Sequence, residues 1–287
     1  MTGCFQPFIT IAYTRLTTQT VHRRIRVPAR RATMGCVTDD LVATAMEAAG
    51  GQTLWNTLRG LTVDLSVGGP VWAMKGWPPG ATFDQTVTLN TGDEHIEFSP
   101  FTRPDWRMTF DAGTDTVALQ ALDGHAVGTL APARAAFKGH LRPTPWDALH
   151  LGYFLGYANW NYFTTPFLFT YPGVTAEEIE PWHEAGQTWR RLRVRFPASI
   201  ATHNPEQVFY FDETGLQRRM DYVTEVLGST LVGHYSGQYR CFDGLQVATR
   251  RRVFRRNPDN TVNLNMPSIT LDIGNVGLHY ANEQARP

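Results

Sequence analysis

The chain has 287 residues, of which 26 are basic and 26 acidic, so its formal net charge at pH 7 is zero. A chain of this length buries roughly 70–75% of its unfolded surface and requires no disulfide or metal staple, and zero net charge removes the general attraction on which nucleic-acid binders rely. The cysteines Cys4, Cys36 and Cys241 lie far apart, which is typical of free thiols in a reducing, here cytoplasmic, compartment. We therefore expect no nucleic-acid partner and no structural metal.

The first 38 residues differ in composition from the rest of the chain. Six arginines occur there before the first acidic residue, Asp39. The stretch lacks the continuous apolar core and the small-residue cleavage site of a secretory signal. We expect residues 1–38 to be a basic, disordered arm or an overlong gene start with Met34 as the natural beginning. Residues 39–280 are expected to form a single domain.

Helical spacing opens this domain, and strand alternation follows it. Apolar residues recur at helical spacing over residues 39–50, where Asp39 or Asp40 can cap a helix that ends at two glycines. A second helical turn is expected over residues 53–58. Between residues 61 and 130, short segments of alternating apolar and polar residues are separated by Gly, Pro and Asp turn formers. That pattern predicts a meander of antiparallel strands.

Residues 145–171, PWDALHLGYFLGYANWNYFTTPFLFTY, carry ten aromatic side chains. A helix that is apolar all round must be buried on more than one side, by core, membrane or bound ligand. A helix over residues 145–164 would be roughly 30 Å long and could cross a bilayer. Asp147, His150, Asn159 and Asn161 interrupt the run and would be costly in hydrocarbon. We therefore expect no transmembrane segment.

Strand alternation resumes after this helix. Over residues 188–196 it places Leu192 and Val194 on one face and arginines on the other. A hairpin is expected over residues 207–226, and further strands are expected at 231–242, 248–255 and 269–273. One antiparallel sheet, strongly curved around an apolar interior and covered by helices inserted between its halves, accounts for the whole pattern.

Two segments of this second half are similar to segments of a known family. They are YFDETGLQRRMDY (residues 210–222) and FDGLQVATRRRVFRR (residues 242–256). Together with the order of the elements, they resemble the lipoprotein-carrier (LolA-like) superfamily. The chain is similar, within it, to a bacterial group with the same PWDALHLGYF and RRRV runs. The resemblance implies an α+β, mainly antiparallel β fold: an incomplete barrel, or curved half-barrel, with an N-terminal helix and an inserted helical lid over an apolar cavity.

Asp147 and His150 are the most specific pair of candidate catalytic residues. They are three residues apart and therefore share one helix face, where a carboxylate orients an imidazole as in a general-base dyad. The same spacing suits a helix cap or a satisfied, partly buried histidine, and both interpretations stay open. None of the nine histidines forms a His-x-x-x-His pair, so no metal site and no cofactor is expected.

The run Arg250-Arg251-Arg252 lies in a predicted strand, so Arg251 points away from its two neighbours. One face of the strand must supply partners such as Asp221 or Glu225, or meet an anionic ligand. Tyrosines and His234 on successive strands add polar groups to the same sheet. A few polar groups converging in an apolar cavity are typical of a small-molecule site.

The first functional hypothesis is the binding of a hydrophobic or amphipathic small molecule or lipid beneath the helix. The expected ligand-binding residues are Trp55, Trp146, Phe154, Tyr157, Trp160, Asn161, Phe163, Phe167 and Tyr222. The alternative is an enzyme using the same cavity for cyclisation, isomerisation or hydrolysis of a hydrophobic metabolite. In that enzyme His150 would be the base, Asp147 its orienter, and Tyr210 or His234 the acid. The oligomeric state stays open, because the aromatic helix could instead pack against a partner chain.

Overall fold

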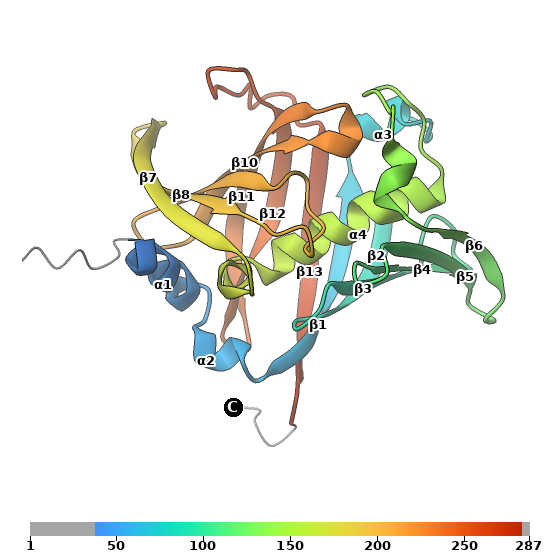
Figure 1. The fold of residues 1–287 in the computed structure, drawn as a ribbon, viewed down its shortest axis with the longest axis horizontal. Coiled ribbons are helices and arrows are strands. Elements are labelled where there is room, and N and C mark those ends of the chain that lie inside the picture. The colour runs from blue at the N-terminus through green and yellow to red at the C-terminus, as the bar shows by residue number, and fades with distance from the viewer. Residues whose placement is uncertain (1–37, 283–287) are drawn as a thin grey trace, which may run out of the picture. The chain divides into compact units, whose positions relative to one another are not determined.

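The computed structural model describes residues 38–282, in which one antiparallel sheet of 13 strands curves around a central helix (Figure 1). The strand order is β6-β5-β4-β3-β2-β1-β13-β12-β11-β10-β9-β8-β7, so the sheet is open, with β6 and β7 at its edges. This confirms the expected half-barrel with an N-terminal helix and an inserted helix. The expected basic arm, up to residue 37, lies outside the described residues.

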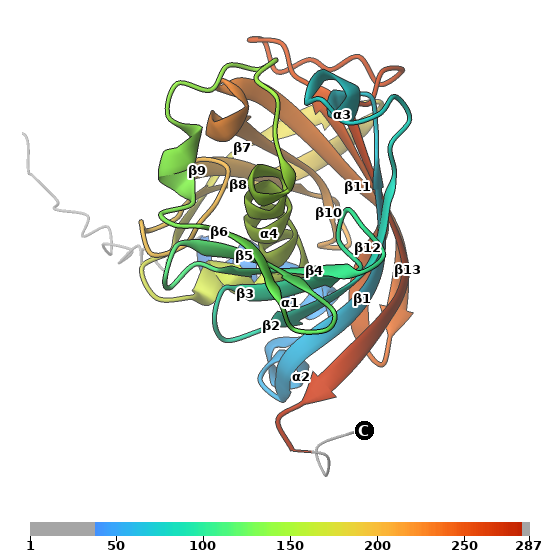
Figure 2. The same cartoon turned by 90° about the vertical axis from the view of Figure 1, so that its right-hand side faces the viewer.

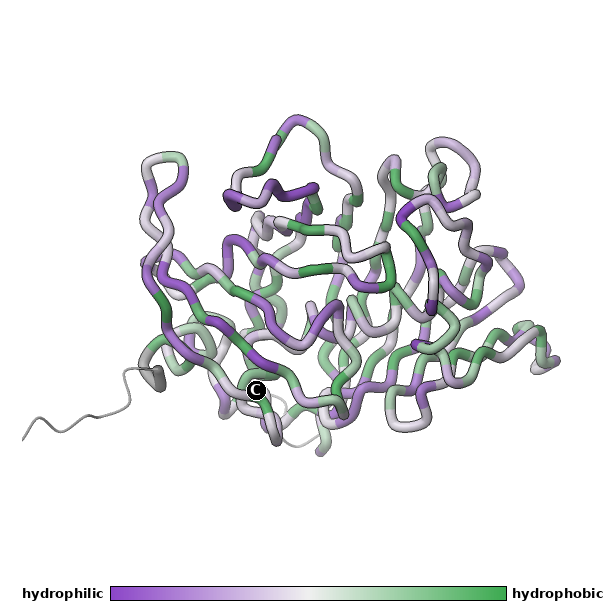
Figure 3. Tube along the Cα trace, turned by 45° about the horizontal axis from the view of Figure 1, so that its top comes forward, coloured by the Kyte–Doolittle hydropathy of each residue, from purple (hydrophilic) through white to green (hydrophobic). Residues whose placement is uncertain are grey.

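The first half of the sheet is the expected meander. Its strands are β1 (Leu58–Gly68), β2 (Phe83–Asn90), β3 (His95–Ser99), β4 (Trp106–Asp111), β5 (Thr116–Ala121) and β6 (Ala126–Leu130). The short helices in this part of the chain are α1 (Thr38–Ala48), α2 (Gln52–Trp55) and α3 (Val71–Met74). Along β2, buried and exposed residues alternate, because one face of the strand packs on the core and the other meets solvent. Figure 3 shows hydrophobic and hydrophilic residues alternating along the strands.

The second half of the chain contains the central helix and the remaining strands. Its elements are η1 (Arg134–Phe137), α4 (Ala148–Thr164), η2 (Phe167–Thr170), β7 (Thr175–Glu184), β8 (Gln187–Arg195), β9 (Glu206–Phe211), β10 (Gln217–Thr224), η3 (Glu225–Leu227), β11 (Thr230–Phe242), β12 (Leu245–Arg255) and β13 (Ile269–Tyr280). The last strand pairs with β1, the first, with Val276 opposite Val63. That pairing joins the two halves into one curved sheet.

Two strands differ from the sequence expectation. Edge strand β7 was not anticipated: its residues are mostly half-buried or exposed, and a register irregularity interrupts its pairing with β8 between Ile179 and Trp182. Edge strands are commonly polar and irregular, which weakens the alternation on which the prediction depends. Strand β13 continues to Tyr280, beyond the expected end at residue 273.

Helix α4 lies on the concave side of the sheet, as Figure 2 shows in a view nearly along the helix axis. Every residue from Leu151 to Thr164 is buried, and the helix packs on strands β3 to β6. Gly152 and Gly156 lie against β4, where a Cβ on Gly152 would come within 2.9 Å of the Met108 side chain. The missing side chains therefore let the helix approach the sheet closely.

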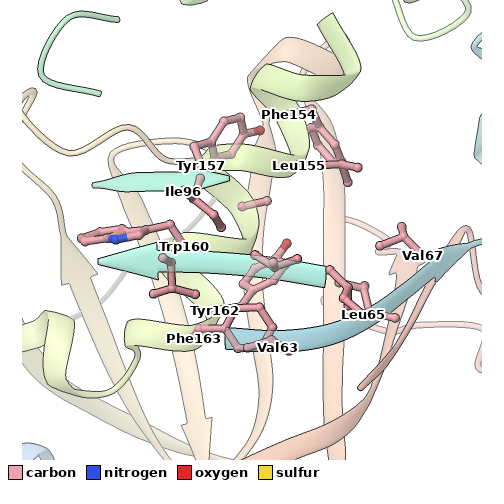
Figure 4. Close-up of a cluster of buried hydrophobic side chains, with 14 of the residues drawn as sticks. Val63, Leu65, Val67, Ile96, Phe154, Leu155, Tyr157, Trp160, Tyr162 and Phe163 are labelled. Atoms are coloured by element: carbon pink, nitrogen blue, oxygen red, sulfur yellow. The ribbon is translucent and has the colours of Figure 1, made fainter. Parts of the chain in front are cut away.

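The aromatic side chains of α4 fill the interior of the half-barrel. Figure 4 shows Phe154, Tyr157, Trp160 and Phe163 among side chains of β1 and β3. Between residues 38 and 282, no helix is long and apolar enough to cross a membrane.

Candidate functional site

Asp147 is the N-cap of α4, and its carboxylate holds His150. Asp147 Oδ1 accepts hydrogen bonds from the backbone N of His150 at 2.9 Å and lies 2.8 Å from His150 Nδ1. Burial raises the pKa of Asp147, but the hydrogen bonds from His150 outweigh it and hold the pKa below its usual value. The side chain of His150 is 19% exposed and packs against the rings of Phe137 and His140. The same carboxylate thus caps the helix and contacts the imidazole, so the cap is present, and a catalytic role of the pair stays a hypothesis.

Lys75 lies at the same end of α4 and was not singled out from the sequence. Its Nζ donates to the carbonyl oxygen of Thr144 at 3.0 Å and lies 3.9 Å from the centroid of the Trp146 ring. Burial and the nearby Arg142 lower the pKa of Lys75 to about 8. No local signal marks this lysine, because its partners are about seventy residues away in the sequence.

His234 belongs to a buried network of tyrosines and histidines beneath α4. The centre of this network is His203, which was not singled out from the sequence. Its Nδ1 lies 3.0 Å from the Tyr157 hydroxyl, and its Nε2 lies 2.7 Å from the Tyr162 hydroxyl. Tyr162 contacts the Tyr222 hydroxyl at 3.1 Å, and Tyr222 lies 3.4 Å from His234 Nδ1. Burial lowers the pKa of both histidines well below the usual value. Both imidazoles are therefore neutral at pH 7.

Arg251 extends this network with a positive charge. It is buried, and its guanidinium donates to Ser236 Oγ at 3.0 Å and to the Tyr162 carbonyl oxygen at 3.2 Å. Its Nε has no hydrogen-bond partner, and among residues 38–282 no carboxylate forms an ion pair with it. Burial accordingly lowers the pKa of Arg251. The group borders a cavity of about 30 Å³ between α1, α4 and the sheet.

Asp221 and Glu225, the acidic residues expected to pair with the arginines of this strand, do not pair with Arg251. Arg256, at the end of the same basic run, does lie 3.5 Å from Asp221 Oδ2 through its Nε. Asp221 forms a bidentate ion pair with Arg219, at 2.7 and 2.8 Å, and Glu225 pairs with Arg134. Arg219 and Asp221 alternate with Tyr222, which faces α4, and therefore lie on the outer face of the sheet. Arg251 points into the interior instead, which explains the missing partner.

Tyr210 belongs to that outer cluster. Its hydroxyl donates to Asp221 Oδ2 at 2.8 Å, and burial raises the pKa of Tyr210 to about 12. The candidate catalytic residues thus occupy three places: Asp147 and His150 at the start of α4, His234 inside the half-barrel, and Tyr210 on its outer face. The structure does not assemble them into one site. Among the described residues, no group of three or more His, Cys, Asp or Glu side chains could hold a metal ion.

The expected ligand-binding residues all lie in the buried interior, where they contact one another and the chain. Trp55 stacks on Phe167 with ring centroids 4.3 Å apart. Trp160 Nε1 donates to the Asn90 carbonyl oxygen at 2.9 Å, and Asn161 Nδ2 donates to the Ala201 carbonyl oxygen at 2.8 Å. The remaining members of the set, Trp146, Phe154, Tyr157, Phe163 and Tyr222, are likewise buried. The interior is therefore apolar, rich in aromatic rings and closely filled.

A groove of about 680 Å³ lies at the rim of the half-barrel, where β12 leads into the loop before β13. Its walls include Arg142, Arg255, Arg256, Asn257, Asn263, Asn265, Met266 and Ser268. A deeper crevice of about 20 Å³ shares Arg142, Arg255 and Ser268 with the groove. The crevice runs between α4 and strands β10 to β13, with apolar walls that include Phe154, Leu227, Val232, Val253 and Ile269. Phe154 and Tyr222 are the two expected ligand-binding residues that line it.

No family model matches the chain, and no curated protein sequence matches it either. Solved structures similar to it include a LolA superfamily protein from Nitrosomonas europaea, at 8% identity, a TM-score of 0.49, and coverage of 88% of this chain and 98% of the other. A DUF1329 family protein from Desulfovibrio piger is similar at 11% identity and a TM-score of 0.46, covering 87% and 99% of the two chains. The first of them carries the superfamily name that the sequence resemblance suggested.

Proposed function

We propose that the protein binds a hydrophobic or amphipathic small molecule, such as a lipid, which enters its half-barrel through the groove at the rim. One observation carries the proposal: the groove, whose lining includes three arginines and three asparagines, continues into an apolar crevice, and the two share Arg142, Arg255 and Ser268. Charged and amide side chains at the groove, followed by apolar side chains in the crevice, suit a molecule with a polar end and an apolar tail. Apolar side chains with a few polar groups are typical of small-molecule sites.

The crevice must widen for an alkyl tail to enter, because about 20 Å³ holds little more than one water molecule. Its wall at Leu227 and Thr230 lies where the short turn after β10 leads into β11. Each methylene group of a ligand buried there contributes about 0.8 kcal/mol. A tail of several carbons therefore compensates for a moderate displacement of these side chains.

Blocking the crevice tests the proposal. Thr230 lines the crevice, is half-buried, and its hydroxyl donates to the Leu227 carbonyl oxygen. Thr230→Trp is expected to weaken binding of a fluorescent fatty-acid analogue at least about tenfold, since an indole occupies the space that the tail needs. Thr116→Trp is the matched control, because Thr116 also opens a strand and its hydroxyl donates to a nearby turn carbonyl.

The control variant is expected to bind the analogue like the wild type. Circular dichroism and thermal unfolding establish that both variants fold. Unchanged affinity in a folded Thr230→Trp protein would contradict the proposed entry route. A second variant, Val253→Ala, enlarges the crevice and should bind the analogue at least as tightly as the wild type. Loss of binding in Val253→Ala would also count against the proposal.

A further inference from the structure

Two arginines at the mouth of the crevice have no acidic partner. Arg142, in the loop before α4, and Arg255, at the end of β12, line both the groove and the crevice. Burial and the positive charge of Arg255 together lower the pKa of Arg142. Within residues 38–282, neither guanidinium forms an ion pair, and the buried Nε of Arg142 has no hydrogen-bond partner. The mouth therefore holds two like charges that repel each other.

The neighbouring arginines differ in this respect. Arg252 binds Asp272 through two hydrogen bonds, at 2.8 and 3.1 Å. Arg256 Nε lies 3.5 Å from Asp221 Oδ2. The remaining polar side chains of the groove are amides and a hydroxyl, from Asn257, Asn263, Asn265 and Ser268. The groove thus offers hydrogen-bond donors and uncompensated positive charge where the apolar crevice begins.

The backbone that carries Arg142 is packed in place. A Cβ on Gly228 would lie 2.7 Å from the Arg142 backbone N, so the chain at position 228 closely abuts this loop. The Thr144 hydroxyl accepts a hydrogen bond from the backbone N of Leu141 at 2.9 Å. These contacts hold the loop against the turn that forms the wall of the crevice. A group bound between the two arginines would therefore meet an Arg142 side chain that is carried on a fixed backbone.

We propose that the ligand carries an oxyanion, a carboxylate or a phosphate monoester, which binds between Arg142 and Arg255 while its alkyl tail enters the crevice. This inference rests on the proposed function and specifies the ligand's chemical class. Guanidinium groups bind carboxylate and phosphate through short, charge-assisted hydrogen bonds. An oxyanion between them would relieve the repulsion and supply acceptors to the unpaired donors. A neutral hydroxyl headgroup would also accept a hydrogen bond, but it would leave the repulsion between the two arginines uncompensated.

Three ligands with the same ten-carbon tail test the inference: decanoate, decyl phosphate and 1-decanol. Their dissociation constants are measured by calorimetry with the wild type, with Arg142→Gln/Arg255→Gln, and with Arg59→Gln/Arg250→Gln. The last protein is the control, since both of its arginines are exposed on strands and its net charge changes equally. The wild type and the control are expected to bind at least one anion about tenfold or more tightly than 1-decanol. The first variant should lose this preference and keep its affinity for 1-decanol.

Each outcome separates the inference from the function on which it rests. Equal affinity of the wild type for all three ligands would overturn the oxyanion site and leave hydrophobic-ligand binding intact. A preference for anions that persists in Arg142→Gln/Arg255→Gln would also overturn the site. If none of the three ligands binds the wild type, the proposed function fails and the inference with it. When the preference is present, the tighter of the two anions identifies the headgroup.

Discussion

The ring of Phe110 in β4 lies directly against the backbone of Gly156 in α4. A Cβ on residue 156 would come within 2.7 Å of Phe110 Cβ and 2.9 Å of its Cγ. Gly152, one turn earlier, approaches Met108 and Val117 in the same way. The spacing Gly-x-x-x-Gly thus forms a smooth strip on an otherwise bulky helix, and this strip sets how closely α4 approaches the sheet.

Gly156→Ala is expected to destabilise the protein by about 1–2 kcal/mol. The added methyl overpacks against Phe110 at a typical cost of about 1–3 kcal/mol, and the better helix propensity of alanine returns up to about 1 kcal/mol. Urea unfolding measures the difference. Gly237→Ala is the control, because its methyl would meet nothing within 4 Å and should change stability by less than about 0.5 kcal/mol. A Gly156→Ala protein more stable than the wild type would show that the close approach does not limit packing.

The two buried arginines of the sheet are expected to respond oppositely to substitution by methionine. Arg219→Met removes the bidentate partner of the buried Asp221, which keeps only the more distant Arg256 at 3.5 Å, and should cost about 3–5 kcal/mol of stability. Arg251→Met removes a buried charge that has no carboxylate partner and should be neutral or stabilising by up to a few kcal/mol. Denaturant unfolding of both variants makes the comparison. Similar destabilisation by both substitutions would argue that hydrogen bonds to Ser236 and Tyr162 compensate the charge of Arg251.

Stability should depend on pH through His234. Its folded-state pKa is far below the unfolded value of about 6.5, so below pH 6.5 the unfolded chain binds a proton that the folded protein does not. Stability is therefore lost as pH falls from about 6.5 towards the folded-state pKa, by about 1.4 kcal/mol per pH unit. His203 has a lowered pKa as well and contributes in the same sense, whereas Glu94 has a raised pKa and contributes in the opposite sense. Both residues are present in the wild type and in a His234 variant, so their contributions cancel in a comparison of the two proteins.

His234→Gln removes this contribution alone. The slope of unfolding free energy against pH, measured by urea unfolding between pH 5.0 and 6.5, should decrease by about 1 kcal/mol per pH unit on average relative to the wild type, since the unfolded histidine is only half protonated at pH 6.5. His125→Gln is the control, since the side chain of His125 is 84% exposed, and it should leave the slope unchanged. An identical slope in His234→Gln would indicate that His234 is protonated in the folded protein.

Asp147→Ala should destabilise the protein by about 0.5–2 kcal/mol, because α4 loses the side-chain acceptor for its first backbone donors. Asp147→Ser keeps a capping oxygen and should recover most of this loss. Thermal unfolding compares the two variants with the wild type. Neither variant is expected to change binding of the fluorescent fatty-acid analogue, since Asp147 does not line the crevice. Loss of that binding in a stably folded Asp147→Ser protein would place the carboxylate in the ligand site.

Features that depend on near neighbours in the chain were predictable. Alternation identified the meander of β1 to β6, and the all-apolar run identified a buried helix. The contact between Asp147 and His150 follows from their spacing of three on one helix. The Gly152-x-x-x-Gly156 spacing was a further local signal that went unused. Edge strand β7 escaped notice because its mostly half-buried and exposed residues carry little alternation.

By itself, the sequence determined that the chain makes a curved antiparallel sheet around an aromatic helix, because strand and helix periodicities are local properties. Only the tertiary structure decided which polar groups meet. His203 joins tyrosines more than forty residues earlier, and Tyr210 faces outward while His234 faces inward. Arg142 meets Arg255 across more than a hundred residues. The alternation of apolar and polar residues along a strand shows which side chains share a face. The pairing of distant strands determines which face becomes the interior.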